Sequence, residues 1–350
     1  MTKYLTHTPI ESRNITPAAL KKFTKLRKDG SSTTVEELVQ QYLVFLKYDG
    51  ICALLFYYGP NDFKLISRTD EEINNFDHIG HAMDSVPWME MCAALQPNED
   101  RPTQYKSGVY FGELWSPDLS AAEIGGLNNL VSAKKIEDAA DDIRKVRFVV
   151  WDFVTHQEWA EGHSPLSFTD RIARLEWMNF IGLPGQPGAP ENASYPPLFF
   201  APCEGTVAEN AATSVNELAK EAKTQGRYDG IICVHPDGTW TKGARDPDKI
   251  KFKPTVTVDL KVVGYEMGKG KYSNVIGKVI CEYGDTEVKV SGMTDGQRGV
   301  GHENYIDAFF KNDWKGQIIE VEAMEVSAHG KLREPRFKRF RSGIDASAAE

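Results

Sequence analysis

The chain has 350 residues, with 41 lysines and arginines against 50 aspartates and glutamates, so its formal net charge is −9. Hydrophobic residues make up 41% of the chain and charged residues 26%, a composition that excludes a disordered or low-complexity protein. No apolar stretch approaches the ~20 residues that a membrane span needs, which indicates a soluble protein without membrane partners, and the length favours two domains.

Two features concern the cellular compartment. Residues 1–17 lack the basic and then apolar pattern of a secretory signal. The five cysteines stand singly and form no C-x-x-C pair, which predicts reduced thiols rather than a disulfide framework or a zinc ribbon. Both features predict a cytoplasmic protein.

The first two thirds of the chain mixes helices and strands. Thr16 as N-cap, Pro17 at the first helical position and Gly30 after the last basic turn predict a leader helix. Apolar and β-branched runs at 42–56 and 63–67 predict a hairpin that carries Lys47 near its first strand. Further strands are predicted at 109–114, 147–154, 198–201 and 230–234, and further helices at 138–145, 168–177 and 214–224. The run 182–197, rich in proline and glycine, predicts a surface loop.

The pattern changes after Pro254. Short alternating strands are predicted at 256–266, 277–283, 287–291 and 317–327, around one helical piece at 305–310. This spacing fits a small β-barrel of the oligonucleotide-binding (OB) type. The predicted architecture is therefore α+β, with a mixed domain at 1–254, an OB-fold domain at 255–343 and a disordered tail at 344–350.

Basic residues gather locally although the whole chain is acidic. They concentrate in the segments 242–253, 269–278 and 331–341. A net charge of −9 argues against binding a polyanion through the whole surface, whereas local clusters can contact phosphates.

The candidate nucleophile is Lys47, in the sequence Lys47-Tyr48-Asp49-Gly50. A lysine becomes a nucleophile when burial or neighbouring positive charge lowers the pKa of its amine. A K-x-D-G pattern alone is frequent by chance, but further short elements follow it in a fixed order. They are Ser67-Arg68, Phe111-Gly112-Glu113-Leu114, Val150-Trp151-Asp152-Phe153, Tyr228-Asp229-Gly230-Ile231-Ile232, the lysine-rich 249–254 and the arginine-rich 331–341.

Together these motifs resemble those of the covalent nucleotidyltransferases. From about residue 42 to 341 the chain is similar to an ATP-dependent DNA ligase, most like the compact single-polypeptide ligases of bacteriophages. The resemblance implies an adenylation (nucleotidyltransferase, ATP-grasp-like) domain of antiparallel sheets and helices, followed by the OB barrel. It also implies that the enzyme seals nicks in duplex DNA during replication, repair or recombination, as a monomer in the cytoplasm, or in the host cytoplasm if a phage encodes it.

The resemblance assigns roles to individual residues. Lys47 would be adenylated by ATP, with Asp49 ordering the site. Arg68 would approach the nucleotide sugar and the 5′-phosphate of the nick. Glu113 would contact the ribose or the metal shell, and Trp151 would stack on adenine.

The remaining assignments concern phosphates and metal. Asp229, where relatives have glutamate, would hold Mg²⁺ together with Glu113, with Mn²⁺ as the alternative ion. Strand alternation places Lys251 and Lys253 on one face, as an α-phosphate clamp that would also lower the pKa of Lys47. On the barrel, the basic side chains of 331–341 would orient pyrophosphate. They are Lys331, Arg333, Arg336, Lys338, Arg339 and Arg341.

The chain departs from the family pattern at three places. Cys52 stands where many relatives have an arginine, and Phe45 where many have a carboxylate that reads the adenine amino group. Residues 342–345 lack the D-K dipeptide that often follows the last motif. Nothing resembles the extra domains of NAD-dependent ligases, which favours ATP as cofactor.

Three other functions stay open at the level of sequence. An RNA ligase and an mRNA-capping guanylyltransferase use the same lysine chemistry. A non-catalytic nucleic-acid-binding protein belongs to a different class, and the presence of Lys47, Glu113, Asp229, Lys251 and Lys253 argues against it.

Overall fold

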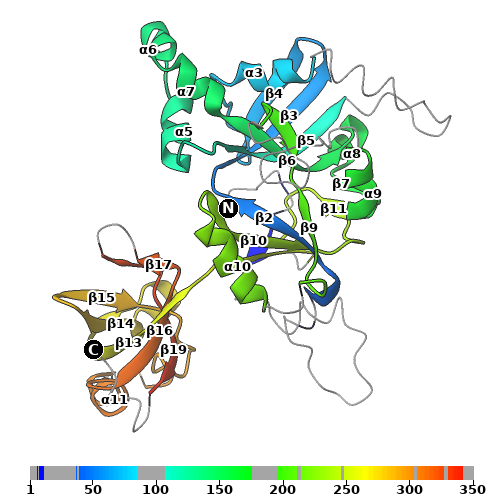
Figure 1. The fold of residues 1–350 in the computed structure, drawn as a ribbon. Helices are drawn as coiled ribbons and strands as arrows, with labels where there is room; N and C mark the ends of the chain where they lie inside the picture. Colours follow the sequence, from blue (N-terminus) through cyan, green and yellow to red (C-terminus); the bar gives the residue numbers. More distant parts are fainter. Residues whose placement is uncertain are drawn as a thin grey trace, which may run out of the picture. The chain divides into compact units, whose positions relative to one another are not determined.

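The computed structural model describes residues 6, 8–11, 37, 39–84, 107–175, 195–210, 214–245, 248–302, 306–326 and 330–341. The chain forms two compact units, residues 1–253 and residues 254–350 (Figure 1). The predicted leader helix, most of the predicted loop at 182–197 and the predicted tail lie outside the described residues. No helix in the described part is long and apolar enough to cross a membrane.

Lys47 belongs to the first sheet of unit 1. Its order is β1 (Ile10–Glu11), β12 (Lys249–Phe252), β10 (Tyr228–Val234), β2 (Leu43–Tyr48) and β9 (Cys203–Thr206). Helix α10 (Val215–Thr224) packs on β10 and starts with a capping box, in which Ser214 and Glu217 satisfy each other's backbone N–H groups. Its apolar side chains join those of β2, β10 and β12 in one buried cluster. One face of the sheet is therefore closed by α10.

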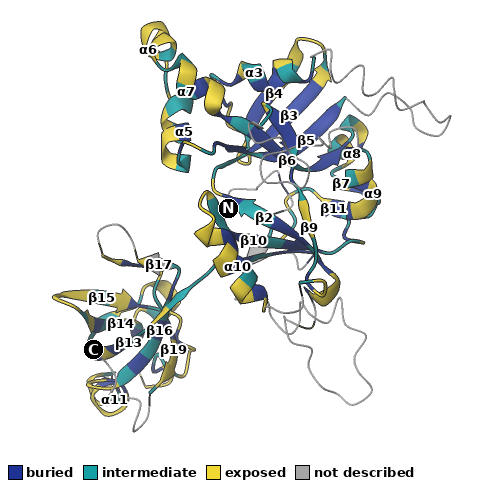
Figure 2. Ribbon diagram, in the orientation of Figure 1, coloured by how far each residue is buried: buried dark blue, intermediate teal, exposed yellow. Residues whose placement is uncertain are grey.

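The second sheet of unit 1 carries the larger hydrophobic core. Its order is β4 (Asp62–Ser67), β3 (Ile51–Gly59), β5 (Gly108–Trp115), β6 (Arg147–Val154) and β8 (Leu198–Phe200). Side chains from β3 are buried on both faces, with Leu55 in one apolar cluster and Leu54 in another. Figure 2 shows the middle of β3 and most of β5 in the colour of buried residues. This explains why β3 reads as a continuous apolar run rather than an alternating one.

Short elements complete unit 1. A two-stranded sheet pairs β11 (Trp240–Thr241) with β7 (His163–Ser164). The helices beside α10 are α3 (Asp77–Ala82), α5 (Ala121–Asn128), α6 (Ala133–Asp138), α7 (Ala140–Lys145), α8 (His156–Glu161), α9 (Phe168–Ala173) and the 3-10 turn η2 (Val39–Gln41). Most strand pairs are antiparallel as predicted, but β1–β12 and β6–β8 are parallel.

The predicted hairpin is wrong in one respect. Residues 42–56 do not form one strand, because the chain bends at Asp49 and Gly50, and β2 and β3 then enter different sheets. A Cβ at Gly50 would lie 2.1 Å from the carbonyl oxygen of Leu114, so only glycine lets the chain pass there. The hairpin consists of β3 and β4 alone. Lys47 therefore lies on one sheet, beside the point where the chain crosses to the other.

Unit 2 is a closed barrel. Its strands run in the order β15 (Thr286–Val290), β14 (Ile276–Tyr283), β13 (Val256–Met267), β16 (Ile318–Ala323) and β19 (Arg336–Phe340). A parallel bridge between Ser291 and Arg336 joins the two edges. The 3-10 turn η5 (Gly270–Tyr272), helix α11 (Ile306–Asp313) and the hairpin of β17 (Glu325–Val326) with β18 (Leu332–Arg333) complete the unit. The α+β class and the predicted OB barrel are confirmed.

Candidate active site

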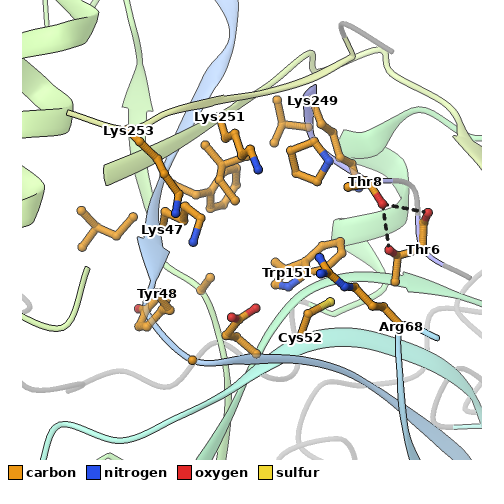
Figure 3. Close-up of a pocket in the computed structure, with 18 of the residues that line it drawn as sticks. Thr6, Thr8, Lys47, Tyr48, Cys52, Arg68, Trp151, Lys249, Lys251 and Lys253 are labelled. Atoms are coloured by element: carbon orange, nitrogen blue, oxygen red, sulfur yellow. Dashed lines mark hydrogen bonds between the residues drawn. The ribbon is translucent and has the colours of Figure 1, made fainter. Parts of the chain in front are cut away.

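Unit 1 contains a cavity of about 420 Å³ whose walls come from both of its five-stranded sheets. Figure 3 shows side chains from β2 and β12 facing Trp151 and Arg68 across it. Among the residues predicted from motifs, the cavity is lined by Lys47, Arg68, Glu113, Trp151, Lys251 and Lys253. The structure thus gathers in one place side chains that are more than 200 positions apart in sequence.

Lys47 and Lys253 share one carboxylate oxygen. Oδ2 of Asp229 accepts hydrogen bonds from Nζ of Lys47 at 2.9 Å and from Nζ of Lys253 at 2.6 Å. Asp229 lies where β10 shifts register against β2, next to Gly230 with a φ of 131°. A Cβ at Gly230 would lie 2.2 Å from the carbonyl oxygen of Phe252, so this irregularity requires glycine. Gly230 is therefore required by the close approach of the Phe252 carbonyl.

The pKa of Lys47 is raised, which contradicts the prediction that it is lowered. Burial alone would lower it, but the negative charges of Glu113, Asp229 and Asp49 outweigh burial. That prediction rests on the nearby lysines and takes no account of these carboxylates. In the absence of substrate, the amine of Lys47 is therefore protonated and held by Asp229.

Glu113, on β5, carries a perturbed carboxyl group. Its pKa is raised to about 7, chiefly by burial and also by the charges of Asp49 and Asp229, whereas the charge of Lys47 and a hydrogen bond from the Gly50 backbone act in the opposite direction. Among the described residues, no three acidic, histidine or cysteine side chains gather as a complete metal site. Glu113 and Asp229 are instead a pair of neighbouring carboxylates, and Mg²⁺ is commonly held by one or two carboxylates plus phosphate oxygens and water. The donor set therefore fits Mg²⁺.

The two lysines of β12, and Lys253 directly after it, follow strand alternation. Lys249, Lys251 and Lys253 all line the cavity, because side chains two positions apart point to the same face of a strand. Lys249 is buried, and its Nζ lies 2.6 Å from Oδ2 of Asp152. The motif predicts only Lys251 and Lys253 on this face, although the same alternation includes Lys249.

One wall of the cavity is apolar. Trp151 stacks on Phe111 at 5.7 Å between ring centroids, and Phe45 meets Phe168 edge to face at the same distance. Phe45, the residue found where relatives often have a carboxylate, is only 4% exposed. The other apolar lining residues are Pro9, Leu46, Ile51, Ala201, Ile232 and Val234. Such a wall suits a flat, apolar group such as a nucleobase.

The N-terminal segment contributes residues that the sequence analysis missed. Strand β1 pairs in parallel with β12, and this brings Thr6 and Thr8 to the cavity. Their hydroxyl oxygens lie 3.3 Å apart, close to Arg68 in Figure 3. No sequence pattern marks a lone two-residue strand that pairs with a partner some 240 positions away. These threonines could be found only from the structure.

Cys52 also lines the cavity, at the position where relatives often have an arginine. Burial raises the pKa of its thiol to about 12, and the charge of Glu113 adds to this. Cys52 is therefore a neutral wall residue rather than a phosphate contact.

Four predicted site residues do not line the cavity. Asp229 is one of them, although its carboxylate accepts hydrogen bonds from Lys47 and Lys253, which do line it. Asp49 is exposed just after β2, where its N–H donates to the carbonyl of Arg227. Arg333 is exposed on β18 of unit 2. Arg341 is also in unit 2, where it pairs with Asp259 at 2.9 Å and Glu320 at 3.1 Å. For Arg341 the structure thus shows a role in holding barrel strands together.

Comparison with known proteins gives the chain a family context. Residues 267–341 match the family model described as DNA ligase OB-like domain. A DNA ligase of Methanothrix thermoacetophila is 30% identical over 134 residues, which are 36% of this chain and 23% of that protein. The chain thus spans about a quarter of the length of this curated relative.

Solved structures share the fold. The structure named Pmar-Lig_PreS3 superposes with a TM-score of 0.58 and 21% identity, covering 97% of this chain and 68% of the other. A structure titled "DNA binding with a minimal scaffold: Structure-function analysis of Lig E DNA ligases" has a TM-score of 0.50 and 19% identity, covering 87% and 93%. The chain is therefore similar to DNA ligases in sequence over part of its length, and it shares the fold of these solved structures.

Proposed function

We propose that this relative of the DNA ligases is itself an ATP-dependent DNA ligase that seals nicks through a covalent lysyl-AMP intermediate. The observation that carries the proposal is the position of Lys47. It lies in a cavity that has apolar residues for a base, lysines for phosphates and the carboxylate of Glu113 for a metal ion, and it is hydrogen-bonded to the neighbouring carboxylate of Asp229. A binding protein without chemistry would have no need for a lysine held beside two acidic groups.

In the first step, Nζ of Lys47 attacks the α-phosphorus of ATP. A P–N bond forms, the bond from the α-phosphorus to the bridging oxygen breaks, and pyrophosphate leaves. The amine must lose a proton, and Asp229 accepts a hydrogen bond from it at 2.9 Å. Lys251 and Lys253 lie on the same wall and stabilise the charge that develops on the phosphoryl oxygens.

Glu113 and Asp229 would hold Mg²⁺, with Mn²⁺ as an alternative, which would neutralise phosphate charge when bound. Trp151 would stack on the adenine, and Arg68 would approach the sugar and the 5′-phosphate of the nick. Asp49, outside the cavity, would order the DNA end of the site. Arg333 and Arg341 of the barrel would orient pyrophosphate.

In the later steps the AMP moves to DNA. An oxygen of the nick's 5′-phosphate attacks the lysyl-AMP phosphorus, the P–N bond breaks, and a pyrophosphate linkage to AMP forms. The 3′-hydroxyl then attacks the 5′-phosphate, which closes the strand and releases AMP. The partner is nicked duplex DNA, which the protein would bind as a monomer in the cytoplasm during replication, repair or recombination.

The test is nick sealing. Purified protein with ATP and Mg²⁺ should join a labelled nicked duplex, and Lys47→Ala should not. An RNA ligase would prefer an all-RNA nick, and a capping guanylyltransferase would take label from GTP rather than ATP. Sealing of only the RNA substrate, or labelling by GTP alone, would overturn the proposal in favour of those relatives.

A further inference from the structure

Lys249 is a buried cation in the wall of the cavity. The residue is only 2% exposed, yet it is one of the lining residues. Its Nζ donates to Oδ2 of Asp152 at 2.6 Å. Because an ammonium group carries three N–H donors, this bond leaves further donor capacity at the cavity wall.

Asp152 is fixed from its other side by Arg171. Nε of Arg171 lies 2.9 Å from Oδ1 and Nη2 lies 3.0 Å from Oδ2 of Asp152, and all of these groups are fully buried. Nη1 of Arg171 donates to the backbone oxygens of Leu166 and Gly238. A rigid network, rather than solvent, therefore determines where the Lys249 ammonium stands.

In this network the guanidinium of Arg171 and the ammonium of Lys249 share the carboxylate of Asp152, and the buried Asp248 acts on Lys249 through its charge. A buried charge is costly unless hydrogen bonds satisfy it. A hydrogen-bond acceptor on a ligand would supply a second partner for Lys249. The cavity is the side from which such an acceptor can approach.

Lys249 lies among aromatic residues, which suit a nucleobase better than they suit phosphates. Its Nζ lies 4.9 Å from the ring centroid of Trp151 and 5.6 Å from that of Phe168. Phe45 packs against Phe168 on the same wall and offers no hydrogen-bonding group. Lys249 is therefore a cationic donor within the aromatic part of the cavity.

We propose that Lys249 is a base-binding residue that donates a hydrogen bond to a ring nitrogen of the purine. The inference rests on the proposed function, because that function supplies ATP as the ligand. Asp152 and Arg171 act as positioning residues, which hold the ammonium at the edge of the base. Base recognition thus uses a donor in β12, in a chain where Phe45 replaces the carboxylate that often reads adenine.

The experiment measures equilibrium binding without Mg²⁺, so that the result does not depend on AMP transfer. The nucleotides are ATP and its 1-deaza, 3-deaza and 7-deaza analogues, each of which lacks one ring nitrogen. The proteins are wild type, Lys249→Met and the control Lys261→Met, which changes a half-exposed lysine of the barrel.

Loss of a hydrogen bond to a charged group costs about 1.5–3 kcal/mol, so Lys249→Met should bind ATP roughly 10- to 100-fold more weakly. For wild type and Lys261→Met, one analogue should bind more weakly than ATP by a similar factor. For Lys249→Met, the same analogue and ATP should bind with equal affinity. Equal loss of affinity for all four nucleotides would place Lys249 on the phosphates instead, and would overturn the proposal. So would normal ATP binding by Lys249→Met.

Two safeguards keep the result decisive. Lys249→Met leaves Asp152 paired with Arg171, so this carboxylate keeps a cationic partner, and thermal unfolding checks the fold. If the variant does not fold, wild type alone decides, because tight binding of all three analogues contradicts the proposal. Failure of wild type to form lysyl-AMP would refute the ligase function, whereas the analogue comparison tests Lys249 independently.

Discussion

Lys47 and Asp229 are 182 positions apart in the chain, and their Nζ and Oδ2 atoms are 2.9 Å apart. This ion pair keeps the amine of Lys47 charged before substrate binds, since neighbouring carboxylates raise its pKa despite burial. Activation must therefore come with the substrate complex, when bound cations and phosphates change the charges around Asp229. The same carboxylate that holds the lysine would then hold the metal.

The first prediction concerns Asp229. Asp229→Asn should lower the rate of self-adenylation by about 10²-fold or more, because it removes the negative charge that pairs with Lys47 and that we propose to hold the metal ion. Single-turnover formation of protein-bound AMP, measured across a range of Mg²⁺ concentrations, checks this. Asp285→Asn, in an exposed barrel turn, is the matched control. A near-normal rate at ordinary Mg²⁺ would show that the ion is held elsewhere.

The second prediction concerns stability. Asp152→Ala leaves Arg171 and Lys249 buried without their carboxylate, which should cost about 3–5 kcal/mol in the free energy of unfolding. Asp141→Ala is the control, since Asp141 pairs with Arg144 but its side chain is 94% exposed. That change should cost less than about 0.5 kcal/mol. Denaturant unfolding measures both, and similar losses in the two variants would mean that the buried network does not stabilise unit 1.

The third prediction gives the pH dependence of the same network. Burial alone would raise the pKa of Asp152, but Arg171 and Lys249 lower it well below its ordinary value of 3.8. The folded state then binds fewer protons than the unfolded state, so this stabilisation is present above about pH 4 and is lost as the pH falls further. Unfolding free energy should drop more steeply with acid in wild type than in Asp152→Asn. Parallel curves would contradict the assignment.

Much of the fold could be predicted from the sequence, because binary patterns report local structure. The alternating residues after Pro254 predicted the barrel strands, and the same period predicted that Lys251 and Lys253 share a face. The break between β2 and β3 was missed, since the reason for it is a carbonyl of Leu114 that approaches Gly50 from another strand. The pattern of hydrophobic residues does not show which distant backbone group lies against a given glycine.

The site residues that belong to sequence motifs could be predicted. The site properties that depend on contacts between distant parts of the chain could not. Thr8 reaches the cavity only through the parallel pairing of β1 with β12. The direction of the Lys47 pKa shift depends on how close Glu113 and Asp229 lie, which no spacing in the sequence reveals. Charge interactions and strand pairing between distant parts of the chain could therefore be determined only from the structure.

The fourth prediction uses a substitution in the barrel to distinguish self-adenylation from the sealing of an adenylated nick. Arg333→Ala should lower self-adenylation at least about tenfold, while sealing of a nick supplied already adenylated stays near normal, if Arg333 orients pyrophosphate. The structure favours this substitution over truncation before Lys331. Truncation would remove β19, whose Phe337 lies in the barrel core 5.0 Å from the ring of Trp314.

Arg341→Ala provides a contrast to Arg333→Ala. It breaks pairs with Asp259 and Glu320, so it should lower the stability of the barrel as well as activity. Thermal unfolding distinguishes the two variants. Equal loss of both reaction steps in a stably folded Arg333→Ala protein would mean that Arg333 serves DNA binding generally.

The most direct measurement is transfer of label from α-labelled ATP to the protein. Wild type incubated with Mg²⁺ should acquire a covalent label that survives denaturing electrophoresis, leaves with acid as expected for a P–N bond, and moves to nicked DNA on its addition. Lys47→Ala should acquire no label, whereas Lys261→Ala, a substitution on the barrel surface, should behave as wild type. Absence of label on wild type, or undiminished labelling of Lys47→Ala, would contradict the account.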